Sequence, residues 1–281
     1  MREDASCFIE MGLRLCLSSP RFVPAKQLKI LSFGLTDVGM RRDHNEDSYL
    51  VDDDAQLYVV ADGMGGHLGG EMASMLAVTT IKESVRDDRA KVVNGRAYKG
   101  PIEQHPALMM LPKAVKRACA AIFRKAQEVP ELQGMGTTAI GVAFVDSYAF
   151  FGHVGDSRAY LIRDGRIEQL SEDHSLVNEQ LKAGLITPEQ ARMSRFKHII
   201  TRSVGFEEDV AVDTMVVPTL EGDIYVLCSD GLANLVSNVE LRDVLQNSFL
   251  RDGPRDLVAL ANERGGDDNI TVVVCYVNGE E

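Results

Sequence analysis

The sequence predicts an α+β fold in which antiparallel sheets are covered by helices. Short segments rich in β-branched and aromatic residues come in consecutive groups joined by tight turns, as at Asp164-Gly165 between 160–163 and 166–170. Segments with helical periodicity separate groups of strands; they do not alternate with single strands, as they would in a parallel α/β fold. Consecutive strands joined by hairpins pair antiparallel, so a doubly wound parallel sheet is not expected.

The individual elements follow from local pattern. Strand segments are short and end near Gly, Asp or Pro: 29–35, 49–51, 57–61, 138–145, 148–154, 158–163, 210–217, 223–228 and 270–277. Helical segments repeat apolar residues at helical spacing: 70–85, 112–128, 239–246 and 254–263. Pro112 and Pro254 suit the first turns of two of these helices. The segments 86–111 and 174–205 lack a clear period apart from a helical stretch at 177–183 and a helix start at 187–189, so we interpret them as a surface loop and a functional loop or lid.

Composition excludes several classes of partner. A net charge of −12 would repel nucleic acid and anionic lipid, so neither is expected to bind. Five scattered cysteines without a CxxC pair predict reduced thiols, as in the cytoplasm, and no zinc site or disulfide framework. The longest apolar runs are far shorter than the roughly 20 residues that cross a bilayer. Glu10 interrupts the apolar stretch that a secretory signal would need, so residues 1–27 are interpreted as an N-terminal extension of unknown role, with a short amphipathic helix as one reading.

Aspartates stand repeatedly at the ends of strand segments. Asp62, Asp156 and Asp230 each follow such a segment, and Asp268 precedes one. Because antiparallel strands place the end of one beside the start of its neighbour, Asp230 and Asp268 are expected at one edge of a sheet. Carboxylates a few ångströms apart cannot all ionise without compensating cations, and oxygen ligands favour Mg²⁺ or Mn²⁺. A single Asp-Gly after a strand is an ordinary turn, so the predicted metal site depends on the four aspartates together.

Two further features add to this site. The charged segment 41–47 is either a solvated turn or a second source of ligands, in which Glu46 or Asp47 joins the carboxylates and an arginine holds an anionic oxygen. The glycine after Asp62 frees the backbone to turn sharply, so that the carbonyl of Gly63 could face a metal.

With these residues in view, the sequence resembles the type 2C metal-dependent serine/threonine protein phosphatases, in particular their bacterial single-domain branch. The resemblance covers about residues 28–277 and rests on a set of motifs in order: RDHNEDS at 42–48, VADGMGGH at 60–67, GTT at 136–138, GDSRAY at 155–160, ITRSVG at 200–205, CSDGL at 228–232 and GDDNIT at 266–271. It implies a four-layer αββα sandwich of two antiparallel β-sheets flanked by helices. It also implies that residues 28–281 form one catalytic domain.

The resemblance assigns roles to the carboxylates. Two cations, Mn²⁺ or Mg²⁺, would be held by Asp62 as the bridge, Asp230 and Asp268 on one cation, the Gly63 carbonyl and Glu46 on the other, and Asp47 through water. Asp156 would hold a third, weaker cation with Asp230, and Arg42 would bind the phosphate. The catalytic set is then Arg42, Asp62, Asp230 and Asp268. Met64 occupies the place of the proposed general-acid histidine of the animal branch. His67 is therefore one candidate acid; the alternatives are that His67 is a hydrogen-bonded structural histidine and that a metal-bound water is the acid.

The implied activity is hydrolysis of phosphoserine and phosphothreonine by direct attack of a metal-activated water. Expected partners are phosphorylated proteins, including a serine/threonine protein kinase and its substrates, and the chain is expected to be a cytoplasmic monomer. Residues 174–205 correspond to the family's flap over the site. Two alternatives stay open: a phosphatase-like module that binds phosphoproteins without turnover, and a metal enzyme that acts on small phosphoesters or nucleotides.

Overall fold

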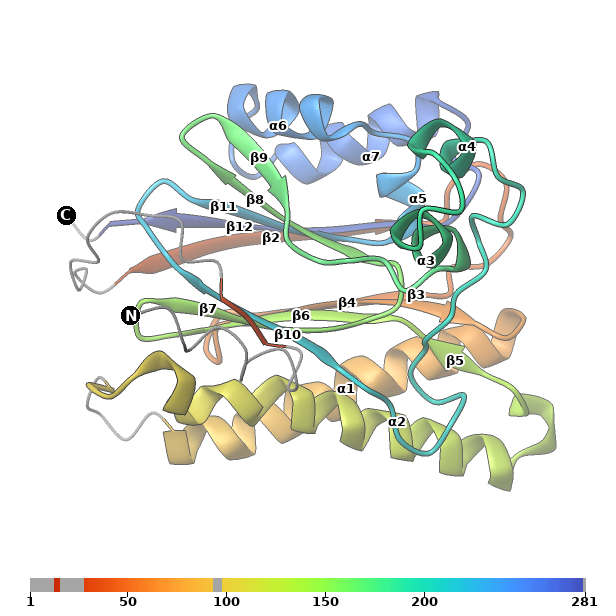
Figure 1. The fold of residues 1–281 in the computed structure, drawn as a ribbon, viewed down its shortest axis with the longest axis horizontal. Coiled ribbons are helices and arrows are strands. Elements are labelled where there is room, and N and C mark those ends of the chain that lie inside the picture. The colour runs from red at the N-terminus through yellow and green to blue at the C-terminus, as the bar shows by residue number, and fades with distance from the viewer. Residues whose placement is uncertain (1–12, 16–27, 93–97, 280–281) are drawn as a thin grey trace.

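A computed structural model describes residues 13–15, 28–92 and 98–279 (Figure 1). Two β-sheets pack face to face, with helices α1 and α2 over one outer face and α6 and α7 over the other (Figure 1). The predicted four-layer αββα sandwich is therefore confirmed.

The first sheet carries the larger number of strands. Its order is β1-β10-β7-β6-β4-β3, and the short strand β5 pairs with β4. The bounds are Leu13–Leu15 for β1, Asp47–Asp52 for β3, Leu57–Met64 for β4, Gly136–Thr137 for β5, Ala139–Val145 for β6, Tyr148–Val154 for β7 and Asp213–Pro218 for β10. Every pair is antiparallel except β1 with β10. Asp47 lies opposite Asp62 in the β3–β4 register, so both carboxylates reach the same end of the sheet.

The second sheet has the order β2-β12-β11-β8-β9, and all its pairs are antiparallel. The bounds are Lys29–Asp37 for β2, Arg158–Arg163 for β8, Arg166–Gln169 for β9, Ile224–Cys228 for β11 and Ile270–Asn278 for β12. Asp164 and Gly165 both have positive φ, 50° and 72°, which is the backbone that a two-residue hairpin turn requires. The predicted hairpin is confirmed, because Arg163 pairs with Arg166 across that turn.

The helices have bounds close to those predicted from periodicity. They are α1 (His67–Val92), α2 (Met110–Glu128), α3 (Leu176–Lys182), α4 (Pro188–Arg192), α5 (Asp230–Ala233), α6 (Asn238–Asn247) and α7 (Gly253–Glu263), with 3-10 turns at Ile102–Gln104, Pro106–Met109 and Pro130–Leu132. A capping box between Ser237 and Glu240 begins α6, and the predicted start at Thr187 forms another at α4. Apolar side chains fill three layers: between α1 and α2 and the first sheet, between the two sheets, and between the second sheet and α6 and α7.

Two predictions about secondary structure were wrong. Helix α1 continues to Val92, so residues 86–92 are not loop; their polar side chains hold the helix to the sheet, with Arg86 bonded to Asp52 and Arg89 to the carbonyl of Phe144. Near the N-terminus, Leu13–Leu15 forms a strand and not part of a helix, because the edge of β10 offers unpaired backbone groups. The rest of residues 1–27 lies outside the described chain.

Candidate functional site

A pocket of about 670 Å³ opens at the end of the sandwich where the aspartate-bearing strand ends meet. The sequence-predicted residues that line it are Arg42, Glu46, Asp62, Gly63, Asp156, Asp230 and Asp268. Asp47 lies behind the pocket wall as the pairing partner of Asp62. The structure thus brings together the residues predicted to hold the metal ions and the phosphate.

These residues come from both sheets of the sandwich. Asp230 and Asp268 do share an edge, because the amide of Ser229 donates to the carbonyl of Thr271 where β11 and β12 pair (3.0 Å). Asp62, however, lies within β4, and Asp156 follows β7; both strands belong to the other sheet. The site is built by two sheets packed face to face, which sequence patterns within a single sheet do not reveal.

Asp47 joins the two sheets beneath the pocket. Its Oδ2 accepts hydrogen bonds from Ser229 Oγ (2.8 Å) and Thr271 Oγ1 (2.6 Å), while its buried Oδ1 has no hydrogen-bond partner among the described residues. Burial raises the pKa of Asp47 to about 7, the two hydroxyl donors oppose that rise, and the charges of Asp230 and Asp268 add to it. A buried carboxylate with an unbonded oxygen lacks a positive partner.

Asp62 and Asp156 show the same deficit of positive charge. Burial and then the neighbouring carboxylates, Asp47 first, raise the pKa of Asp62 well above its usual range. Burial followed by the charge of Asp230 raises the pKa of Asp156 to about 7, and Asp156 Oδ1 is also buried without a hydrogen-bond partner among the described residues. Close, desolvated carboxylates with free oxygens are the donor set that hard divalent cations prefer.

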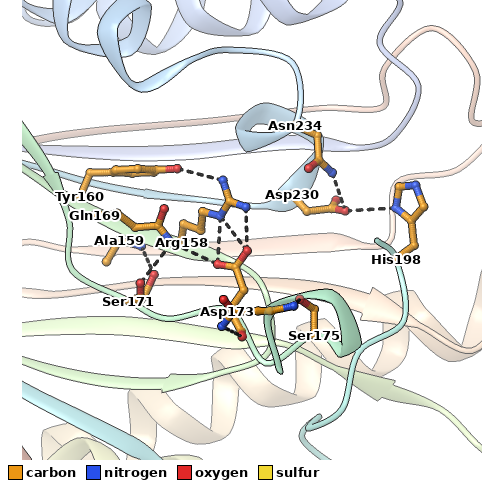
Figure 2. A network of polar contacts seen from close by, with 11 residues as sticks. Arg158, Ala159, Tyr160, Gln169, Ser171, Asp173, Ser175, His198, Asp230 and Asn234 are labelled. Atoms are coloured by element: carbon orange, nitrogen blue, oxygen red, sulfur yellow. Dashed lines mark hydrogen bonds and ion pairs between the residues drawn. The ribbon is translucent and has the colours of Figure 1, made fainter. Parts of the chain in front are cut away.

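The oxygen ligands of the pocket therefore fit Mn²⁺ or Mg²⁺, although their side chains are not arranged in a closed coordination shell. Within the described ranges, no three acidic, histidine or cysteine side chains are arranged to hold one metal ion. Asp268 Oδ2 instead accepts a hydrogen bond from Arg42 Nη2 (2.8 Å). Asp230 Oδ2 accepts from Asn234 Nδ2 (3.0 Å) and lies 3.8 Å from His198 Nδ1 (Figure 2). These contacts partly offset the charge that a cation would neutralise.

Gly63 is required by close packing. A Cβ at this position would collide with the backbone carbonyls of Gly70 and Glu46, and the amide of Gly63 donates to the Glu46 carbonyl (3.1 Å). The carboxylate of Glu46 lies against Gly70 near the start of α1, where a Cβ would meet it. The absence of side chains at both glycines lets Glu46 approach the chain after Asp62.

Sequence reasoning missed several pocket residues. Lys197 and His198 come from the segment between α4 and β10, which was assigned to the flap without naming any side chain that faces the site. Asn269 was quoted within a motif, and its side chain fixes the loop that carries Glu46 by bonding to the Glu46 amide and to the carbonyls of Val38 and His44. The side chain of the candidate acid His67 lies outside the described part of the chain.

A salt bridge next to the site steadies the loop after β9. Arg158, at the start of β8, binds Asp173 through both Nε and Nη2, and Gln169 also donates to Asp173 (Figure 2). Asp173 precedes His174, so this pair holds the start of the flap against the second sheet. Bidentate arginine–carboxylate pairing fixes orientation as well as distance.

Comparison with known proteins agrees with this geometry. Residues 40–262 match the family described as Protein phosphatase 2C. The chain is 39% identical over 251 residues to Protein phosphatase PhpP of Streptococcus pneumoniae, covering 88% of this chain and 97% of that protein. It is 38% identical over 247 residues to the Serine/threonine phosphatase stp of Listeria welshimeri, covering 86% and 94% of the two chains.

Solved structures of serine/threonine phosphatases share this fold. The serine/threonine phosphatase PstP/Ppp of Mycobacterium tuberculosis superposes with a TM-score of 0.79 at 33% identity, covering 89% of this chain and 99% of that one. A catalytic domain of serine threonine protein phosphatase PstP in complex with two manganese ions gives a TM-score of 0.74 at 34% identity, covering 90% and 100%.

Proposed function

The chain belongs to the protein phosphatase 2C family, and from that premise we propose which of its residues hold the metal ions and the substrate. It is a metal-dependent protein serine/threonine phosphatase that uses Mn²⁺ or Mg²⁺. When bound, two such cations supply the positive charge and the activated water for direct hydrolysis of the phosphoester.

The observation that carries the assignment is the convergence of carboxylates from both sheets on one pocket. Asp62 would lie between the cations, with Asp230 and Asp268 on one side and Glu46 and the Gly63 carbonyl on the other. The buried Oδ1 atoms of Asp47 and Asp156 support this assignment, because neither accepts a hydrogen bond from any residue in the described part of the chain. Asp47 would act through water and Asp156 would hold a third, weaker cation with Asp230.

Arg42 is the proposed phosphate ligand. Its side chain is half exposed at the pocket wall and donates one hydrogen bond to Asp268, and its other N–H groups have no partner among the described residues. A planar guanidinium binds two phosphate oxygens at once, so it can orient the phosphoryl group for attack and stabilise its charge as the bond breaks.

The remaining assignments concern the cell and the whole chain. We place phosphorylated proteins as substrates, with a serine/threonine protein kinase acting in opposition, and treat the chain as a cytoplasmic monomer whose catalytic domain is 28–281. Within the described residues, no helix is long and apolar enough to cross a membrane.

Turnover of a phosphothreonine peptide tests the assignment. Activity should require Mn²⁺ or Mg²⁺, stop in excess chelator, and fall at least 100-fold in Asp230→Asn. The matched control is Asp209→Asn, since Asp209 is exposed and pairs with Lys116 away from the pocket. Undiminished turnover in chelator would sink the proposal, and faster turnover of nucleotides than of phosphopeptides would favour the small-substrate alternative. Calorimetry that detects no Mn²⁺ binding would favour the inactive binding module.

A further inference from the structure

The flap carries a run of exposed basic and apolar side chains beside the pocket. We call residues 195–199 the flap rim. Lys197 and His198 line the pocket, and Arg195, Phe196 and Ile199 are exposed next to them. Figure 2 shows His198 reaching from this segment toward Asp230. The flap rim therefore forms part of the mouth of the catalytic pocket.

Two of these basic side chains do not neutralise the protein's own carboxylates. His198 approaches Asp230, but among the described residues neither Arg195 nor Lys197 forms an ion pair. The guanidinium of Arg195 lies over the ring of Phe196, 4.9 Å from its centroid. In a chain of net charge −12, unpaired cations at the mouth of an active site attract anionic groups of an incoming molecule.

The apolar members of the flap rim indicate the size of that molecule. Phe196 and Ile199 are 42% and 44% exposed, and they adjoin the cations along the chain. A single phosphate ester would occupy the pocket and leave these side chains uncovered. A polypeptide that continues beyond the phosphorylated residue would cover them while its own side chains meet Arg195 and Lys197.

We propose that the flap rim selects phosphoprotein segments in which acidic residues flank the phosphorylated serine or threonine. This rests on the proposed function and names the substrate class of the same site. An exposed ion pair changes a binding equilibrium by about 1.5- to 5-fold, so two such pairs give about 2- to 25-fold discrimination, on the order of ten-fold. The preference weakens as salt screens the charges.

Matched peptides test the proposal. Three phosphothreonine peptides differ only in having Asp, Ala or Lys on both sides of the phosphothreonine, and kcat/KM is measured with Mn²⁺. The wild-type protein should prefer the Asp peptide over the Lys peptide by roughly ten-fold at low salt and by less at high salt. Lys197→Glu should lower that ratio several-fold or invert it, because the Lys peptide gains a partner.

The control is a charge reversal at the other end of the sandwich. Lys99 is exposed next to Tyr98, whose amide bonds Asp146 in the turn between β6 and β7, so Lys99→Glu changes the net charge equally without touching the pocket. Its ratio should equal that of the wild type. Arg195→Glu provides a second variant if Lys197→Glu does not fold.

The outcomes separate the two proposals. If no peptide is hydrolysed with Mn²⁺, the proposed function fails. If all three peptides are hydrolysed at equal kcat/KM, or if Lys197→Glu and Arg195→Glu keep the wild-type ratio, the function stands and the flap-rim inference is overturned. A shift of the ratio in Lys99→Glu equal to that in Lys197→Glu would also overturn it, because the effect would then come from net charge alone.

Discussion

Replacing His153 with Phe should remove a specific acid sensitivity from the fold. His153 lies on β7, is fully buried, and stacks on His174 with ring centroids 4.8 Å apart. Neither of its ring nitrogens has a hydrogen-bond partner among the described residues. Burial, and next the repulsion of His174, lower the pKa of His153 from 6.5 to about 3, while Asp213 and the Ser157 backbone oppose this weakly.

The size of the effect follows from proton linkage. Between pH 6.5 and pH 3 the unfolded chain binds a proton at this histidine and the folded protein does not. The free energy of unfolding therefore decreases as the pH falls through this range. A pKa lowered from 6.5 to about 3 corresponds to roughly 5 kcal/mol in total. About 1 kcal/mol of this is lost between pH 7 and pH 5.5.

The assay is urea unfolding in chelator, followed by far-UV circular dichroism because the chain has no tryptophan. The free energy of unfolding of His153→Phe minus that of the wild type should rise by about 1 kcal/mol from pH 7 to pH 5.5. Other titrating groups, including the carboxylates of the pocket, are present in both proteins and cancel in this difference. Val154→Ala is the control, since it perturbs the same buried strand without a titrating group. A difference between His153→Phe and wild type that stays constant with pH would refute the reasoning.

Three further outcomes are expected. Gly63→Ala should lower the unfolding temperature by the equivalent of about 1–3 kcal/mol, because its Cβ meets two backbone carbonyls, and an unchanged melting curve would contradict the packing argument. Adding Mn²⁺ at about 100 times its Kd to metal-free protein should raise the free energy of unfolding by about 2.7 kcal/mol, measured by thermal unfolding. The Asp62→Asn variant should lose most of this gain. An equal gain in both proteins would count against Asp62 as a metal ligand. Asp213 binds His174 (3.1 Å) and Arg202 (2.6 Å), which lie at the two ends of the flap. The Asp213→Asn variant should therefore be cleaved faster within residues 183–196 in limited proteolysis. A cleavage rate equal to that of the wild type would show that these contacts do not hold the flap in place.

Local patterns predicted most of the secondary structure because the forces that decide it are local. The hairpin at Asp164-Gly165 and the capped start at Thr187 were predicted from side-chain chemistry over a few residues. The last turns of α1 were missed because Arg86 and Arg89 are held by polar bonds to distant residues, which leave no apolar period in the sequence. The strand Leu13–Leu15 was missed for a similar reason, since its partner β10 lies about 200 residues away along the chain.

The candidate site divides in the same way. The sequence by itself determined that strands end in aspartates and that the chemistry belongs to oxygen ligands and divalent cations, because residue type and order carry that information. Only the tertiary structure decided that Asp62 and Asp156 come from one sheet and Asp230 and Asp268 from the other, that Asp47 ties the sheets together from below, and that Lys197 and His198 face the pocket. The physical reason is that the two sheets pack through apolar side chains, and the sequence of a single strand does not specify which strand of the other sheet it will face. The packing of the whole core therefore decides which strand ends meet.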